Sequence, residues 1–209
     1  MPDRPLLSVV IPTLDEQTTV GALLSDLAAL IVRAEVIVAD GGSTDLTLDV
    51  CRAAEATIVQ SATGRGVQLR AGADVARAPL LFFVHADARL DRAALALLDE
   101  IAVAPPPCAM AFRLWIDAPG LGFRLIEWGA NLRSRLLRLP YGDQGLLVRR
   151  EDYVRAGGST RGPDCSKTSR SCAPSTGSPA CTYWMPPSTC RHVGGAPRAC
   201  CAARCRTGF

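Results

Sequence analysis

Apolar residues in the first hundred positions fall into two alternating patterns, short continuous runs and longer stretches at helical spacing. The short, β-branched runs predict buried strands at residues 7–11, 35–39, 57–60 and 80–85. Apolar residues three and four positions apart predict helices over residues 18–32, 44–54, 65–78 and 91–104. Strands and helices that alternate in units of this size predict an α/β fold, a mainly parallel sheet with helices on both faces. A ligand is then expected at the carboxyl ends of the strands.

Details of the predicted helices follow from their flanking residues. Ser43 or Thr44 is expected to cap the second helix, and Asp91 the fourth, which stops before the prolines that begin at Pro105. In the third helix, the apolar face is expected to run through Val67, Ala71, Val75 and Ala78.

A further helical stretch carries a leucine-rich face over residues 121–139. Its apolar positions are Leu121, Leu125, Trp128, Leu132, Leu136 and Leu139, and its charge comes from Arg124, Arg133, Arg135 and Arg138. One interpretation is an interfacial helix that meets a membrane or a lipid-linked acceptor. The other, which the pattern alone favours, is an amphipathic helix packed on the sheet with its arginines in water.

Composition divides the chain at Gly158. Two of the nine cysteines precede this residue and seven follow it, in a segment rich in Ser, Pro, Thr, Gly and Arg with almost no aliphatic residues. We therefore expect one domain over residues 1–158 and a low-complexity tail over residues 159–209. The tail lacks the apolar residues needed to offset the entropy of ordering, so we expect it to be disordered.

The overall charge and the N-terminal segment narrow the class of protein. A formal charge of +3 is too small to indicate a nucleic-acid partner. The opening MPDRPLLSVVIP is too short to span a membrane and carries no cleavage pattern, so a cytoplasmic protein is expected.

Polar residues cluster after each predicted strand, where a nucleotide would explain them together. Carboxylates there can accept hydrogen bonds from a base or ribose, glycines let the backbone approach phosphate, and arginines neutralise it. The candidate nucleotide-binding residues are Pro12, Thr13, Glu16, Asp40, Gly42, Ser43, Asp45, Arg65 and Arg70. His85 and Asp87, two positions apart on a turn, could both reach one divalent ion.

Single members of this set have simpler interpretations. Asp40 and Asp45 could be turn or cap residues, and His85 alone is more often a satisfied histidine than a metal ligand. A dinucleotide oxidoreductase fits poorly, because no G-x-G-x-x-G lies between the first strand and helix.

Four segments, in order and at the right spacing, resemble the inverting glycosyltransferases of family 2, which have the GT-A fold. The segments are SVVIPTLDE, EVIVADGGSTDLT, LLFFVHADARL and YGDQGLLVRREDYVRAGG, within residues 6–158. The last resembles a small soluble bacterial subgroup in which HAD replaces the usual Asp-x-Asp and GDQG follows.

The resemblance implies a role for each matching residue. Thr13, Glu16 and Asp40 would hold the nucleoside, and Arg70 would face the diphosphate. Asp87, with His85, would bind Mg²⁺ or Mn²⁺, while Asp143 and Gln144 would line the sugar or acceptor side.

The implied reaction transfers a sugar, with inversion, from a UDP- or GDP-linked donor to an unknown acceptor, which could be a lipid or isoprenoid. Peripheral membrane contact is compatible with this reaction, and the oligomeric state is not indicated. In the family, the general base comes from a Glu-Asp pair shortly after the glycines that match Gly157 and Gly158. This chain has no such pair there. A nucleotide-sugar-binding protein without turnover is therefore the alternative.

The residues after Gly158 are compatible with a shifted reading frame. The family continues with Phe, an E-D-V-E-L-like helix and later R-R-W. Codons that take the last base of one triplet and the first two of the next can give Phe from Gly158-Ser159, and must give Leu from Asp164-Cys165. Residues 166–169 can then give Glu-Asp-Val, and residues 192–195 can give Arg-Arg-Trp. We interpret the tail as the C-terminus of the enzyme read out of frame.

The rival interpretation is a cysteine-rich metal or disulfide module. The tail has no C-x₂-C pair, and His192 is its only histidine, so zinc-ligand spacing is absent. A disulfide framework does not suit a reducing cytoplasm.

Overall fold

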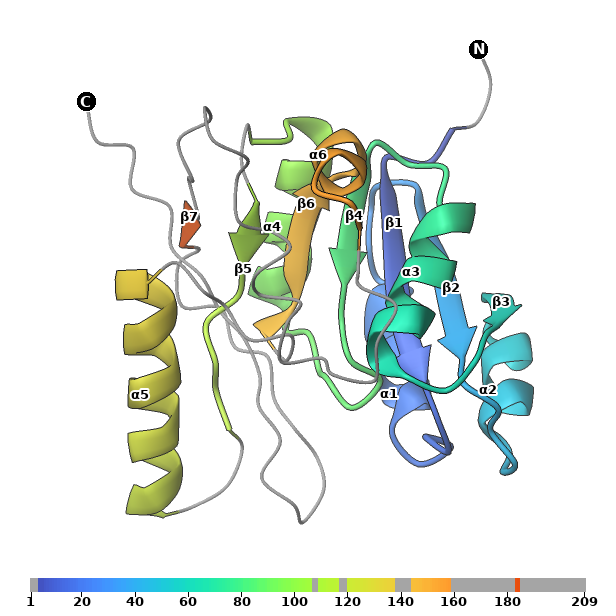
Figure 1. The fold of residues 1–209 in the computed structure, drawn as a ribbon, viewed down its shortest axis with the longest axis horizontal. Helices are drawn as coiled ribbons and strands as arrows, with labels where there is room; N and C mark the ends of the chain where they lie inside the picture. The colour runs from blue at the N-terminus through green and yellow to red at the C-terminus, as the bar shows by residue number, and fades with distance from the viewer. Residues whose placement is uncertain (1–3, 107–108, 117–119, 138–143, 159–182, 185–209) are drawn as a thin grey trace.

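The structure is a computed structural model that describes residues 4–106, 109–116, 120–137, 144–158 and 183–184. Within these residues one sheet of seven strands has the order β3-β2-β1-β4-β6-β5-β7 (Figure 1). Its strands are β1 (Leu7–Thr13), β2 (Ala34–Asp40), β3 (Thr57–Gln60), β4 (Leu80–Phe83), β5 (Met110–Ala111), β6 (Leu146–Arg149) and β7 (Tyr183–Trp184). The predicted tail from residue 159 lies outside the described residues, except for β7.

Strands β3, β2, β1 and β4 pair in parallel, and β6 joins β4 in the antiparallel direction. The carboxyl ends of the four parallel strands therefore lie at one edge, and β6 begins at that same edge. The predicted α/β fold with a mainly parallel sheet is confirmed.

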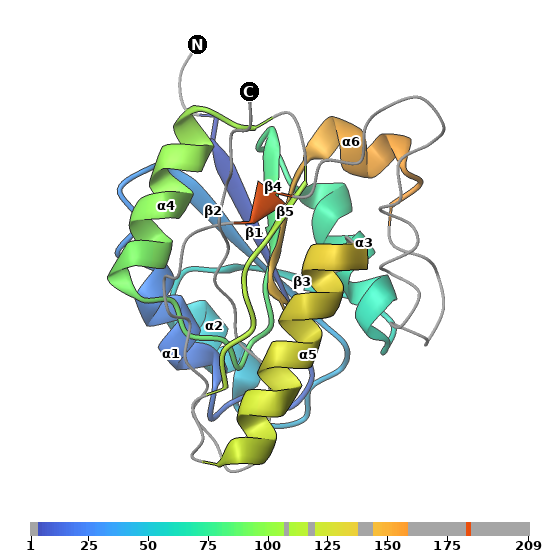
Figure 2. The same ribbon diagram turned by 90° about the vertical axis from the view of Figure 1, so that its left-hand side faces the viewer.

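Helices cover both faces of the sheet (Figure 2). Helices α1 (Val20–Leu27), α2 (Thr47–Ala53) and α4 (Arg92–Val103) pack on one face, with the side chains of Leu7, Val9 and Ile11. Helices α3 (Arg65–Val75) and α6 (Arg150–Arg155) pack on the other, with Val10, Ile37 and Phe83. The alternation of β1 between these two cores follows from the two-residue period of a strand.

Three predicted helices begin or end elsewhere than the pattern indicates, and one of them, α3, stops at Val75 rather than at residue 78. Helix α1 stops at Leu27 rather than near residue 32, and Ile31 is 90% exposed. The amides of Ile31 and Val32 instead donate to the carboxylate of Asp99 on α4, at 3.0 and 2.9 Å. Helix α2 begins at Thr47 without a Ser43 or Thr44 cap, while Asp91 caps α4 as predicted, accepting from the amide of Ala94 at 2.7 Å.

The buried face of α3 differs from the predicted one. Its buried residues include Gln68, Leu69, Gly72 and Ala73, whereas Val75 is 46% exposed. Small residues face the sheet because the helix lies very close to β1. A Cβ placed on Gly72 would lie 2.4 Å from Cγ1 of Val10, so only glycine fits there.

Helix α5 (Leu121–Leu137) stands beyond β5 at the outer end of the sheet (Figure 1). The sequence pattern favoured burial of its leucine face, and this is wrong. Leu121, Leu125 and Trp128 are exposed, and the residues that α5 buries are polar: Glu127, Asn131 and Ser134. Leu132 of the predicted face is half-buried, and the side chain of Leu136 and the whole of Leu139 lie outside the described part of the chain.

Candidate functional site

The loops after β1 and β2 are joined by reciprocal hydrogen bonds. The carboxylate of Asp15 accepts from the amide of Thr44 at 2.8 Å, and the amide of Asp15 donates to the Ser43 hydroxyl at 3.0 Å. One residue pair further along, the amide of Gln17 donates to Asp45 at 3.2 Å. The two loops therefore form one ordered rim at the carboxyl edge of the sheet.

Asp40 organises the start of the second loop. It ends β2 with no exposed surface, and one carboxylate oxygen accepts from the amides of Gly42 and Ser43, each at 3.0 Å. The other oxygen accepts from the hydroxyls of Ser43 and Thr13, the latter at 3.2 Å. Burial opposes ionisation, but these hydrogen bonds together hold the pKa of the Asp40 carboxyl below its ordinary value.

Glu16 and Asp45 also hold the rim together. The Glu16 carboxylate accepts from the hydroxyl of Thr19 at 2.6 Å, and its amide donates to the Thr47 hydroxyl at 2.8 Å. The side chain of Asp45 accepts from the amide of Thr47 at 2.9 Å, and Thr47 is the first residue of α2. Asp45 therefore has the turn role considered above; its nucleotide role stays a prediction. Pro12 is buried within β1.

Sequence reasoning missed Gln68, which ties α3 to the strand ends. Its buried side-chain amide donates to the carbonyls of Thr13 at 2.7 Å and Ala39 at 3.1 Å. These carbonyls belong to the last residue of β1 and the penultimate residue of β2. The signal in the sequence was the polar Gln68 among the small residues of α3. The predicted buried face ran through Val67 and Ala71 instead, so Gln68 was not expected to face the sheet.

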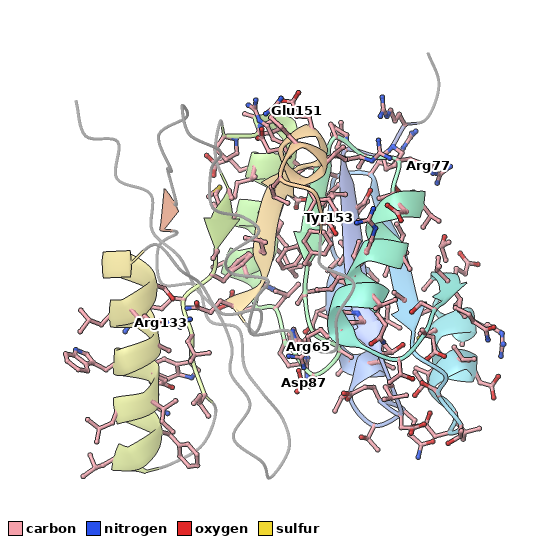
Figure 3. The ribbon with its side chains drawn as sticks, viewed as in Figure 1. Arg65, Arg77, Asp87, Arg133, Glu151 and Tyr153 are labelled. Atoms are coloured by element: carbon pink, nitrogen blue, oxygen red, sulfur yellow. The ribbon has the colours of Figure 1, made fainter. Side chains whose placement is uncertain are left out.

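Arg65 and Arg70 come from the same helix but occupy different positions. Arg65 begins α3 and lies at the carboxyl edge, at the same end of the sheet as Asp87 (Figure 3). Arg70 lies further along α3, where it donates to the carbonyl of Gly157 at 3.3 Å and lies 3.8 Å from the Asp74 carboxylate. Arg65 is thus better placed than Arg70 for an anion at the strand ends.

His85 and Asp87 follow β4 in a tight turn closed by a hydrogen bond from the amide of Ala88 to the carbonyl of His85 at 3.1 Å. Asp87 is 9% exposed and His85 is half-buried. Across the part of the chain that the structure describes, no three His, Cys, Asp or Glu side chains gather to hold a metal. The pair suits an ion that completes its coordination with oxygens of a bound ligand.

Gln144 begins the chain segment that enters β6, and Asp143 lies outside the described residues. The Gln144 side chain is buried, and its carbonyl oxygen accepts from the hydroxyl of Ser134 on α5 at 2.6 Å. Gly145 follows with a φ of 54°, and a Cβ there would lie 3.0 Å from the Phe82 ring. The final glycine of GDQG is therefore required by the backbone and by packing.

A cavity of about 650 Å³ lies at the opposite end of the sheet, near the start of β4. It is lined by Arg4, Pro79, Pro105, Arg149, Arg150, Glu151, Val154 and Arg155, and Figure 3 shows Glu151 far from Asp87. Of the predicted site residues within the described ranges, none lines it. We place the candidate site at the carboxyl edge, because the ordered polar network is there.

Comparison with protein families matches residues 8–153 to the model of glycosyl transferase family 2. The match covers both loops of the rim and the segment after β4. The chain belongs to glycosyl transferase family 2. Its family membership agrees with the resemblance seen in the sequence, and a comparison with curated proteins finds no match.

Solved structures of GT-A glycosyltransferases share the fold. TarS residues 1–349 from S. aureus match with a TM-score of 0.62 and 17% identity, covering 79% of this chain and 54% of that one. A Pyrobaculum calidifontis mannosyltransferase in complex with GDP-Man and Mn²⁺ matches with a TM-score of 0.57 and 22% identity, covering 75% and 48%.

A third is glucosyl-3-phosphoglycerate synthase from Mycobacterium tuberculosis in complex with Mn²⁺ and UDP-glucose. It has a TM-score of 0.54 and 21% identity, and the match covers 71% of this chain and 57% of that one. This glycosyltransferase chain therefore spans about half the length of the solved structures it matches. No helix in the described part of the chain is long and apolar enough to cross a membrane.

Proposed function

We propose that this chain binds a nucleoside-diphosphate sugar, UDP- or GDP-linked, across the carboxyl ends of β1, β2 and β4. The observation that carries the proposal is the rim anchored by Asp40, which the chain orders by its own hydrogen bonds at the edge where such folds bind ligands. The family membership supports transfer of the sugar as the reaction.

Each rim residue has a distinct proposed task. Thr13, Glu16 and Asp40 hold the nucleoside, and Gly42 lets the backbone approach phosphate. In the structure the Ser43 hydroxyl donates to an oxygen of Asp40. A base that hydrogen-bonds Asp40 must therefore displace that hydroxyl or use the neighbouring backbone groups.

A divalent ion, Mg²⁺ or Mn²⁺, is part of the proposal because of the local charge. The edge carries the carboxylates of Asp15, Glu16, Asp40, Asp45 and Asp87, and Arg65 lies at the same end of the sheet as Asp87. A diphosphate would be repelled by this set unless a cation accompanied it. Asp87 and His85 would hold the ion, which when bound would neutralise the departing nucleoside diphosphate.

Arg65 would hold a diphosphate oxygen from the start of α3. Arg70 keeps its proposed contact with the diphosphate only if it leaves the Gly157 carbonyl. Asp143 and Gln144 would line the sugar or acceptor side, and the acceptor would be a lipid, an isoprenoid or another small hydroxyl compound. Inversion requires one displacement, with the acceptor hydroxyl losing its proton to a carboxylate.

The chain provides no Glu-Asp pair after Gly158 for that proton, so a nucleotide-sugar-binding protein without turnover is the second candidate. The two differ in one measurement. Both candidates predict binding of a nucleotide sugar. Glycosyl transfer by the unaltered chain would support only the glycosyltransferase. Transfer that appears only when the proposed reading frame is restored after Gly158 would support the frame hypothesis, and resequencing of the gene around that codon tests it directly.

Binding is tested by ligand-detected NMR with a panel of UDP- and GDP-linked sugars, with and without Mn²⁺. We expect Asp87→Asn to weaken binding at least about tenfold and to remove its dependence on the metal. The control is Asp49→Asn, because Asp49 is an exposed carboxylate on α2 that pairs only with Arg52 among described residues. Failure of every sugar to bind, or an Asp87→Asn variant with wild-type, metal-dependent binding, would contradict the proposal.

A further inference from the structure

Helix α5 attaches to the molecule through polar side chains. The side-chain amide of Asn131 bonds both backbone groups of Leu114, accepting from its amide at 2.8 Å and donating to its carbonyl at 3.0 Å. One turn earlier, Glu127 accepts from the amide of Ile116. These side chains satisfy the backbone groups of Leu114 and Ile116 as a neighbouring strand would.

Among the side chains of α5 that the structure describes, the exposed ones are apolar. Leu121 is 84% exposed, Leu125 68%, Trp128 65% and Ile126 54%. The other exposed positions of the described helix are Gly122 and Gly129, where an added Cβ would meet nothing within 4 Å. Contiguous exposed apolar side chains of this size mark a contact surface.

Cationic and aromatic side chains border this face. The guanidinium of Arg124 lies 4.5 Å from the centre of the Trp115 ring and pairs with Glu127 at 2.8 Å, which fixes both at one flank of the helix. Residues 121–138 contain four arginines against one glutamate, and Arg113 is exposed on the neighbouring segment. An apolar stripe with tryptophan and a surplus of arginine is complementary to an anionic lipid surface.

We propose that the exposed face of α5, comprising Leu121, Leu125, Ile126 and Trp128, docks onto an anionic membrane surface. The apolar side chains enter the boundary between headgroups and acyl chains, and Arg113 and Arg124 contact lipid phosphates. Trp115 and Trp128 have the amphipathic rings that favour this depth.

A second copy of the chain suits this face less well. A helix of 17 residues is about 25 Å long and about 10 Å wide, so one face covers far less than the ~800 Å² that each partner contributes to a stable interface. A lipid surface needs no such minimum, since each inserted side chain adds to the binding.

The position of α5 relates the membrane docking to the class of acceptor, an inference that rests on the proposed function. Ser134 of α5 is hydrogen-bonded to Gln144, a residue of the proposed acceptor side. A helix on the membrane would therefore hold that side of the site close to lipid headgroups. The acceptor class that fits is a lipid-linked or isoprenoid hydroxyl rather than a freely soluble one.

The test is flotation of the full chain with vesicles of phosphatidylcholine alone or mixed with phosphatidylglycerol. We expect binding to the anionic vesicles, weakened by salt, and at least about a tenfold loss of partitioning for Leu125→Glu and for Trp128→Ser. The matched control is Val103→Glu, because Val103 is 70% exposed on α4 and should leave binding unchanged. Circular dichroism checks that the variants fold, as expected for exposed positions.

Three outcomes would overturn the inference. They are no flotation of the unaltered chain, equal flotation of the Leu125→Glu and Trp128→Ser variants, or a dimer in sedimentation velocity that Leu125→Glu dissociates. Nucleotide-sugar binding is measured on the same proteins without vesicles. Vesicle binding without nucleotide-sugar binding leaves the docking surface standing and contradicts the proposed function, while the reverse result contradicts only the docking surface.

Discussion

The parallel half of the sheet and the α5 region bury opposite kinds of side chain. Around β1, β2 and β4, apolar residues from strands and helices form two cores, and the buried polar residues Thr13 and Asp40 lie at the strand ends. At α5 the buried contacts are polar and the exposed face is apolar. Helix α5 is attached by side chains that bond backbone groups of the segment after β5, whereas the helices over the paired strands are attached by apolar side-chain packing.

The same substitution should have opposite effects in the two regions. Gly72→Ala places a Cβ 2.4 Å from the stiff, buried Val10 side chain, and we expect it to lower the free energy of unfolding by about 2–3 kcal/mol. Gly129→Ala on α5 meets nothing within 4 Å and should raise it by about 0.5–1 kcal/mol through helix propensity. Urea unfolding measures both, and a cost of similar size at both positions would break the comparison.

Removal of the Asp40 charge should destabilise the parallel half by about 2 kcal/mol at neutral pH. In Asp40→Asn, an NH₂ group replaces one carboxylate oxygen, and NH₂ donates hydrogen bonds rather than accepting them. Both carboxylate oxygens of Asp40 accept from N–H or O–H groups, so at least one of these donors loses its acceptor. We expect the loss in urea unfolding, together with faster hydrogen exchange at Gly42 and Ser43. Unchanged exchange at both amides would show that the carboxylate does not order the loop.

The pH dependence of this effect has a definite sign. Because the folded protein holds the pKa of Asp40 below 3.8, its contribution is complete above that pH and is lost as the pH falls through the folded value. The unaltered chain should therefore lose this part of its stability in acid, and the free energy of unfolding of Asp40→Asn should fall less steeply there. Parallel acid profiles of the two proteins would contradict the linkage.

A test of the α5 attachment replaces its polar anchor with an isosteric apolar residue. Asn131→Leu removes both hydrogen bonds to Leu114 and should cost about 1–2 kcal/mol, even though it makes the buried face more apolar. Hydrogen exchange at the Leu114 and Ile116 amides should accelerate in this variant. Trp128→Ala, by contrast, should leave exchange at both amides unchanged and should alter the free energy of unfolding by less than about 0.5 kcal/mol. A stabilised Asn131→Leu variant would mean that α5 packs like any amphipathic helix.

The smallest expected effect is chemical rather than energetic. Cys51 has no exposed surface, and burial, followed by the nearby charge of Asp40, raises the pKa of its thiol to about 11. We expect it to resist alkylation in the native protein at about pH 8, and to react once urea unfolds the parallel half. Site-resolved mass spectrometry measures this, and rapid native alkylation of Cys51 would show that α2 opens readily.

Much of the candidate site could be read from the sequence, because its residues follow strands whose apolar runs are unambiguous. Thr13, Asp40 and the Ser43 loop lie together at the carboxyl edge as expected, since parallel strands end at one edge. Gln68 was not predictable, because its contact depends on how closely α3 approaches the sheet. Likewise, the sequence could not show that Arg65 rather than Arg70 lies at the strand ends, because this depends on which part of α3 is next to them.

The sequence alone determined the alternation of strands and helices, the family motifs and the edge that carries the polar loops. These follow from local periodicity and from backbone preferences, which are set within a few residues. Only the tertiary structure decided which face of α3 and of α5 is buried. That choice depends on distant partners, the Val10 side chain for Gly72 and the backbone groups of Leu114 for Asn131, and no local pattern encodes them.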